Sequence, residues 1–200
     1  MKQAVSLDRE ETSLFRDFFE LNGWVVFIFI CLCYGLMSYA VQEYVITNEV
    51  YYNTFGEQLT MARVSEILDF QKKFLPLRLA IIPLVVFLQI FLASICINVG
   101  LLLSNMKVAF GKLFSIVMKA SLIFVIGKVL QLFIALVTEI KALADFQKTD
   151  IFSLNGLLSN LGMNVNELLT YPLSLINIFE IAFVVVTGIG LSLAMQKESK

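Results

Sequence analysis

The residues of this chain best suited to chemistry are a few charged and amide side chains set within long apolar segments. Lys128 and Glu180 lie in two of these segments, and Gln89 lies in a third. A charged side chain surrounded by hydrocarbon costs about 3 kcal/mol when nothing neutralises it. We therefore expect Lys128 and Glu180 to form a hydrogen-bonded ion pair, with Gln89 as a third member of the same polar layer.

Catalytic arrangements of other kinds find little support in the sequence. The chain has no histidine, which excludes a Ser-His or Cys-His nucleophile, a histidine-bound zinc ion and the metalloprotease helix H-E-x-x-H. Ser115 and Lys119 are one helical turn apart, the spacing of an ordinary helix-surface pair, and we expect the Lys119 ammonium to reach the lipid headgroups. We expect a protein that is not an enzyme and that binds neither a cofactor nor a metal ion.

The apolar segments that hold these residues are long enough to cross a lipid bilayer. They comprise residues 24–41, 79–103, 113–137 and 173–195. About 20 apolar residues suffice for a helix to span the hydrocarbon, and unbroken apolar runs indicate helices because the backbone finds no water there. We predict an all-α fold: a polytopic helical membrane bundle with four transmembrane helices, in a single membrane domain over residues 1–200.

The composition agrees with a membrane location. Hydrophobic residues make up 58% of the chain and charged residues 16%, a balance that would leave a soluble domain covered with apolar surface. The formal net charge of −1 gives no basic surface for nucleic acid. We expect the lipid bilayer and other membrane proteins as partners, and no nucleic acid.

The expected ion pair also depends on depth in the bilayer. In an antiparallel third and fourth span, Lys128 lies about 21 Å from the inner end of its helix. Glu180 lies about 20 Å from the inner end if its span begins at Leu173. Because the two depths match, the charges are expected to meet.

The segments outside the spans are expected to form helices along the membrane surface. Residues 1–22 carry an apolar stripe, which predicts an interfacial helix. The connection 42–78 has helical spacing over 59–74, and the connection 138–172 suggests two short helices. The expected caps of these short helices are Asp150 and either Asn164 or Asn166. Since both connections fall on one side of a four-span topology, we expect a small cap there that contacts a partner.

Small residues in the last span are spaced for close helix packing. Gly188 and Ser192, and likewise Gly190 and Ala194, are four residues apart, which allows another helix to approach. We expect packing inside the bundle, with a dimer seam as the alternative.

The orientation follows from the basic residues, because cytoplasmic segments are enriched in lysine and arginine, above all in short loops. The segments on the side of the termini hold Lys2, Arg9, Arg16, Lys107, Lys112, Lys197 and Lys200. The two long connections hold Arg63, Lys72, Lys73, Arg78, Lys141 and Lys148. The sets nearly balance, but the short loop and the nearby Lys119 favour cytoplasmic termini.

Two segments resemble the Ypt-interacting-protein (Yip) family of membrane proteins. They are KVAFGKLFSIVMKASLIFVIGKVLQLFI and, near the C-terminus, YPLSLINIFEIAFVVVTGIGLSLAM. In that family a span opens on Asn, an apolar residue and Phe and closes on a glycine pair; the corresponding residues are Asn177, Phe179, Gly188 and Gly190. The chain has four spans instead of the usual five and lacks a long polar N-terminal region, so the resemblance implies a member of bacterial type in the inner membrane.

Two functions follow as expectations. The first is a non-catalytic integral membrane scaffold or accessory subunit that associates with other membrane proteins, such as a transport or secretion complex. The alternative is a small transporter or channel with a polar layer at Lys128 and Glu180. Such proteins usually show more intramembrane polar residues, broken helices or inverted repeats, so we favour the first.

Overall fold

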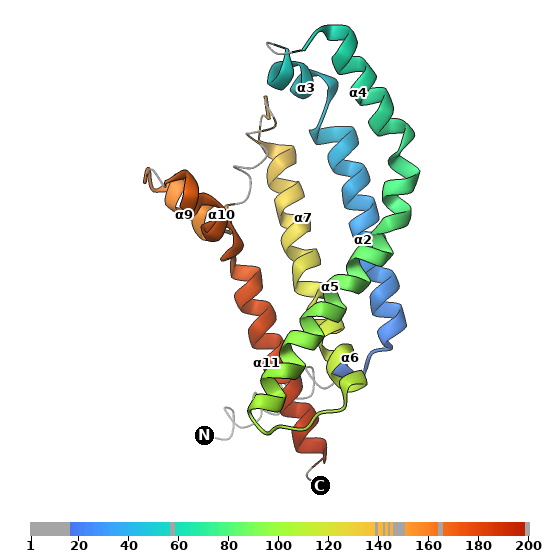
Figure 1. Cartoon of the computed structure of the whole chain (residues 1–200), viewed down its shortest axis with the longest axis vertical. Coiled ribbons are helices and arrows are strands. Elements are labelled where there is room, and N and C mark those ends of the chain that lie inside the picture. Colours follow the sequence, from blue (N-terminus) through green and yellow to red (C-terminus); the bar gives the residue numbers. More distant parts are fainter. Residues whose placement is uncertain are drawn as a thin grey trace, which may run out of the picture. The chain divides into compact units, whose positions relative to one another are not determined.

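Helices make up most of the part of the chain that the computed structural model describes, residues 17–56, 59–138, 140–141, 143, 145, 151–163 and 166–198 (Figure 1). Within these residues an isolated β-bridge joins Ser153 to Asn177. The helices are α2 (Gly23–Ala40), the π-helical turn η1 (Val41–Val45), α3 (Asn48–Phe55), α4 (Met61–Lys73), α5 (Leu75–Leu103), α6 (Phe110–Ala120), α7 (Leu122–Val137), α9 (Leu154–Asn160), α10 (Glu167–Leu175) and α11 (Ile178–Glu198).

Four helical segments are long and apolar enough to cross a membrane: Gly23–Val45, Leu75–Leu103, Phe110–Val137 and Ile178–Met195. The prediction of an all-α, multi-pass helical membrane bundle is confirmed. The first three segments agree with the predicted spans to within four residues at each end. In the third, α6 and α7 meet at Ser121, whose hydroxyl donates to the Val117 carbonyl over 2.8 Å, a contact that tends to bend helices.

The predicted fourth span, 173–195, is wrong at its start, because α11 begins only at Ile178. The first three residues of the predicted span end α10 instead. Ile176 then takes an extended conformation, and Asn177 caps α11, its Oδ1 accepting a hydrogen bond from the Phe179 N–H over 2.9 Å. A cap of this kind starts a new helix inside an apolar run that hydropathy alone treats as continuous.

The chain divides into two compact units, and each of the four spans contributes residues to both. The first unit comprises Met1–Cys31, Leu84–Ile123 and Ala182–Lys200. The second comprises Leu32–Pro83 and Phe124–Ile181. The prediction of a single membrane domain over residues 1–200 stays a prediction.

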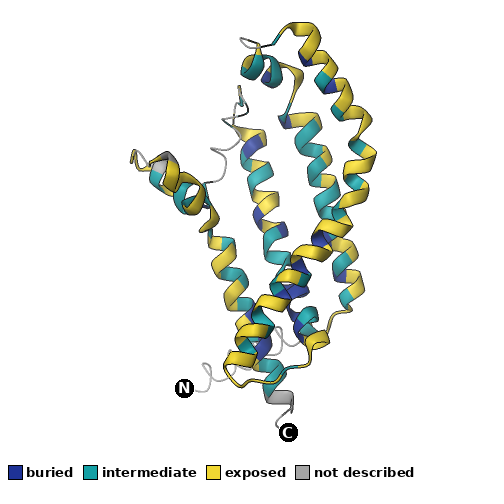
Figure 2. Cartoon of the chain, in the orientation of Figure 1, coloured by how far each residue is buried: buried dark blue, intermediate teal, exposed yellow. Residues whose placement is uncertain are grey.

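Helix α6 supplies much of the buried core of the first unit (Figure 2). Its residues Leu113, Val117 and Ala120 have no exposed surface. Two aromatic contacts join α6 to α5, with ring centroids 5.9 Å and 6.0 Å apart; the pairs are Phe87 with Phe114 and Phe91 with Phe110. Aromatic contacts of this kind add to the packing that drives helix association in lipid.

Helix α11 joins this core through a glycine. A Cβ atom built on Gly190 would lie 2.6 Å from Ile116 Cγ2 and 2.7 Å from Phe19 Cζ. Real Cβ atoms do not come so close, so the packing requires glycine here. A Cβ on Gly188 would meet nothing within 4 Å.

The first long connection forms two helices, α3 and α4, in the second unit. Helix α4 confirms the helix predicted over 59–74, whereas α3 was not predicted. The two helices pack against each other, and the Tyr51 hydroxyl of α3 donates to Gln71 Oε1 of α4 over 2.9 Å. A single turn residue, Phe74, separates α4 from α5.

The second long connection contains α9 and α10, which pack against each other. Asn166 is the cap of α10, since its Oδ1 accepts from the Leu168 N–H over 3.1 Å. Ser153 takes the corresponding place before α9, its Oγ accepting from the Gly156 N–H over 3.1 Å. The predicted cap Asp150 and the alternative Asn164 lie outside the described residues. So does most of the predicted interfacial helix 1–22, of which the structure describes residues 17–22.

The two glycines of α11 make a matched pair of test positions. We expect Gly190→Leu to lower the free energy of unfolding by about 1–3 kcal/mol, since the added side chain must displace Ile116 and Phe19. We expect Gly188→Leu to leave it unchanged. The fraction of monodisperse protein that survives heating in a mild detergent measures both. Equal losses in the two variants would contradict the packing of α11.

Candidate functional site

Of the three residues predicted to form an intramembrane polar layer, Lys128 and Glu180 are not joined in the structure. Lys128 lies on α7, where its ammonium donates to Gln131 Oε1 over 3.0 Å. Glu180 lies on α11, is exposed, and makes no ion pair with Lys128 within the described part of the chain. Gln89 belongs to the first unit and is exposed, whereas the other two residues belong to the second.

Depth explains why the predicted ion pair does not form. Because α11 begins at Ile178 and not at Leu173, Glu180 lies in its first turn, about 3 Å along the helix axis from its start. Lys128 lies nine residues before the end of α7 at Val137, which is about 13 Å. A carboxylate in a first helical turn is stabilised by the helix dipole, so Glu180 has a local role at its own helix terminus.

Lys119 has a structural role that the sequence did not predict. Instead of reaching the headgroups it is buried, with 5% of its surface exposed, and its ammonium donates to the Phe19 carbonyl over 2.6 Å. The helical residues 17–20 end just after Phe19, where carbonyl groups lack partners within the helix. The lysine therefore ties the helical residues 17–20 to α6.

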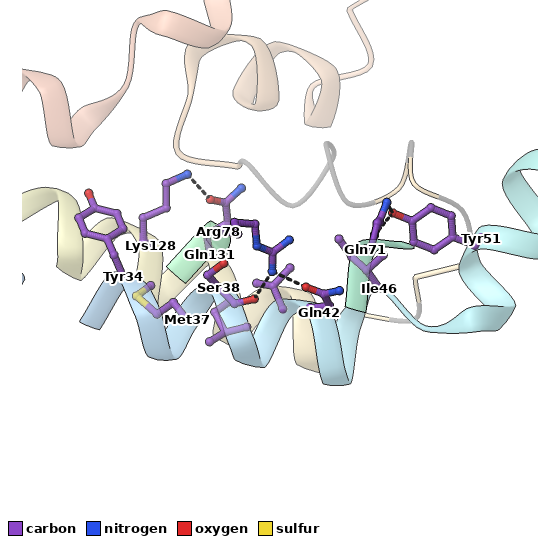
Figure 3. Close-up of a pocket in the computed structure, with 12 residues that line it drawn as sticks. Tyr34, Met37, Ser38, Gln42, Ile46, Tyr51, Gln71, Arg78, Lys128 and Gln131 are labelled. Carbon is purple, nitrogen blue, oxygen red and sulfur yellow. Dashed lines mark hydrogen bonds between the residues drawn. The ribbon is translucent and has the colours of Figure 1, made fainter. Parts of the chain in front are cut away.

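The candidate functional site is a cavity of about 550 Å³ in the second unit (Figure 3). Its lining comes from α2, η1, α3, α4, α5 and α7. The twelve lining residues are Tyr34, Met37, Ser38, Val41, Gln42, Ile46, Tyr51, Gln71, Arg78, Lys128, Gln131 and Leu132. The cavity thus lies near the ends of three spans that adjoin the long connections, and it combines polar with apolar side chains.

Two basic side chains line the cavity, and each donates hydrogen bonds to uncharged oxygen atoms. Arg78, the fourth residue of α5, donates through Nη2 to the Ser38 carbonyl over 3.4 Å and to Gln42 Oε1. Lys128 donates to Gln131, as described above. Among the described residues that line the cavity, none is acidic. The described lining of the site therefore carries two positive charges and no carboxylate.

Side-chain amides and hydroxyls complete the polar part of the lining. Figure 3 shows the Tyr51 ring pointing toward Gln71, and a hydrogen bond joins the two. Arg78 and the residues that it binds lie between this pair and Lys128 in the same view. These groups can both donate and accept hydrogen bonds, so they can adapt to a polar ligand beside the cations.

Of the two basic residues that line the cavity, the sequence analysis identified one as a candidate site residue. It identified Lys128, with Gln131 beside it, but treated Arg78 only as a charge in a connection. The signal for Arg78 was its place at the start of a span, near an amide, Gln42, at the end of another. An arginine at such a boundary needs acceptors, and the adjoining span end can supply them.

The candidate packing residues of α11 divide between two faces. Gly190 is buried and Ala194 half-buried, while Gly188 and Ser192 are exposed. Residues two apart on a helix point about 200° away from each other, so the two small-residue pairs cannot both face the same neighbour. One pair serves packing within the chain, and the other is open.

Comparisons with known proteins identify no family for this chain: no family model, no curated protein and no solved structure matches it.

The partner of Lys128 can be tested by changing its charge. We expect Lys128→Met to leave thermal stability in detergent unchanged or to raise it, because the variant removes a cation that has only an amide as partner. Glu180→Gln should have little effect, and the exchange of Lys128→Glu with Glu180→Lys should rescue nothing. Loss of stability in each single variant, with recovery in the exchange, would show that an ion pair exists after all.

Proposed function

We propose that this protein is a non-catalytic integral membrane subunit, a scaffold or accessory component that associates with other membrane proteins through its exposed helix faces. The observation that supports this most directly is the outward stripe of small residues on α11. Gly188 and Ser192 are exposed one turn apart, and a side chain at position 188 would meet nothing within 4 Å. Small residues give helices in lipid a close approach that large apolar side chains deny.

The opposite face of the same helix packs against other residues of the chain. Gly190 contacts Ile116 and Phe19 of its own chain, so α11 has one side for its own core. Val184, which is 67% exposed, is a larger residue on the same outward face, one turn before Gly188. This geometry supports a second helix, from another protein, packed along Val184, Gly188 and Ser192.

The resemblance to the Yip family, bacterial type, supports the same proposal, because it implies a helical scaffold without a catalytic motif. On that basis we propose that the protein lies in the bacterial cytoplasmic (inner) membrane. The balance of basic residues, weighted toward the short loop around Lys107, supports cytoplasmic termini. The two long connections, with α3, α4, α9 and α10, would then face the other side.

A small transporter or channel is the second candidate, and one observation favours it. The cavity beside Lys128 combines polar and apolar side chains at a level where three spans contribute residues. Glu180 does not line it, so the polar layer of this alternative would consist of Lys128, Gln131 and Arg78. Measurement of solute flux in proteoliposomes distinguishes the two candidates, since an accessory subunit alone moves nothing.

The outward stripe can be tested by cross-linking and substitution. We expect a photoreactive amino acid at Val184 to form a product with another membrane protein in native membranes. Gly188→Leu should abolish this product without changing stability, because a large side chain prevents close helix approach. The same photoreactive residue at the exposed position Phe133 of α7 serves as control. Cross-links to lipid alone at Val184 would count against the proposal.

The topology is tested by single cysteines in a background without Cys31, Cys33 and Cys96. We expect Asp69→Cys on α4 and Met163→Cys after α9 to react with an impermeant maleimide from the periplasmic side. Lys107→Cys in the short loop should react only after the membrane is opened. Labelling of all three from one side would contradict the four-span arrangement, and the reverse pattern would contradict cytoplasmic termini.

A further inference from the structure

The cavity of the second unit has two positive charges and, among its described lining residues, no carboxylate that neutralises them. Arg78 and Lys128 both line it, and their hydrogen-bond partners are a carbonyl and two amide oxygens. Neutral acceptors orient a cation but leave its charge in place. Both side chains are exposed, so an anion that enters the cavity can reach them.

Both cations keep donors that the described protein groups do not use. To the described part of the chain Arg78 donates through Nη2, which leaves Nε and Nη1 for a ligand. The Lys128 ammonium has three donors, and one of them serves Gln131. A guanidinium with free donors on two nitrogens matches the geometry of a phosphate or carboxylate, which it can bind through two parallel hydrogen bonds.

The other lining residues favour a ligand that is larger than a single small ion. The volume of about 550 Å³ falls within the range of small-molecule sites, roughly 300–1,000 Å³. Met37, Val41, Ile46 and Leu132 give the cavity an apolar part beside the cations. The hydroxyl of Tyr34 and the amide of Gln131 offer further hydrogen bonds to the oxygen atoms of a head group.

The position of the cavity along the spans suits a ligand whose charge lies at the membrane boundary. Arg78 is about 5 Å from the start of α5, and Lys128 is about 13 Å from the end of α7. The boundary between the phosphate groups of the lipids and the hydrocarbon falls between the depths of these two residues. We propose that this cavity binds a phosphate group, carried either by an anionic phospholipid or by free inorganic phosphate. The inference does not depend on the accessory-subunit proposal, since a scaffold and a transporter could both hold such a ligand.

Two probes identify the source of the phosphate. The full-length protein, purified and stripped of lipid in a neutral detergent, is titrated with short-chain phosphatidylglycerol and, separately, with inorganic phosphate. Binding is followed by native mass spectrometry and by the shift in melting temperature. Saturable binding of phosphatidylglycerol assigns the site to a lipid, and saturable binding of inorganic phosphate assigns it to the free ion. Either result supports the proposal, and saturation by neither probe overturns it.

Substitutions show whether the binding belongs to this cavity. We expect Arg78→Gln and Lys128→Gln each to weaken the binding of the active probe about tenfold, since each removes a charge-assisted hydrogen bond. Arg78→Lys, which keeps the charge but not the planar fork, should bind less tightly than the wild type and more tightly than Arg78→Gln. Lys73→Gln on α4 is the matched control, because Lys73 is exposed and does not line the cavity.

The test remains decisive if one of the two variants, Arg78→Gln or Lys128→Gln, does not fold. If Arg78→Gln does not yield folded protein, Lys128→Gln alone decides, because its single bond is to a neighbour on the same helix and its loss should not disturb packing. Unchanged affinity in Lys128→Gln, with saturable binding in the wild type, would place the ligand elsewhere and overturn the proposal.

Discussion

Basic side chains in or beside the spans need oxygen atoms as hydrogen-bond acceptors. This requirement determines local helix contacts within each of the two units. Water is absent from hydrocarbon, and an unsatisfied cation there is costly. In the first unit, Lys119 donates to the Phe19 carbonyl and so fixes residues 17–20 against α6. In the second, Arg78 donates to Ser38 and Gln42 and so joins the start of α5 to the end of the first span. The cations therefore contribute to helix packing.

The same requirement gives the cavity its character. Neutral carbonyls and amides satisfy the directional bonding of a cation but leave its charge. With Glu180 used in the first turn of α11, no carboxylate among the described lining residues offsets Arg78 and Lys128. If each of these two cations were paired with a carboxylate, the cavity would have no net charge. This one has a positive cavity with an apolar part, and both the ligand that we infer and the second candidate function depend on that feature.

Much of the fold could be predicted because bilayer thickness restricts what an apolar run can be. The first three spans, the helix at Met61–Lys73 and the cap at Asn166 agree with the prediction. The start of the fourth span does not, since the residues of 173–178 other than Asn177 are apolar or small and mean hydropathy shows no break there. The signal that was missed is local: Asn177 followed three residues later by Glu180 is the spacing of a capping box. Had it been recognised, Glu180 would have been placed at a helix end, away from the depth of Lys128.

The site was less predictable than the fold, because its contacts join residues far apart in the chain. Gln131 near Lys128 could be read from helical spacing, whereas the contact of Arg78 with Gln42 depends on which span ends meet. The buried lysine at position 119 could not be distinguished from one that reaches the headgroups, since both lie near the end of a span. An experimental structure in a lipid bilayer tests the central claim most directly. We expect such a structure to show Arg78 bound to Ser38 and Gln42, Lys128 bound to Gln131, and no carboxylate within 4 Å of either cation. A carboxylate of Glu180 bonded to Lys128 would contradict this expectation.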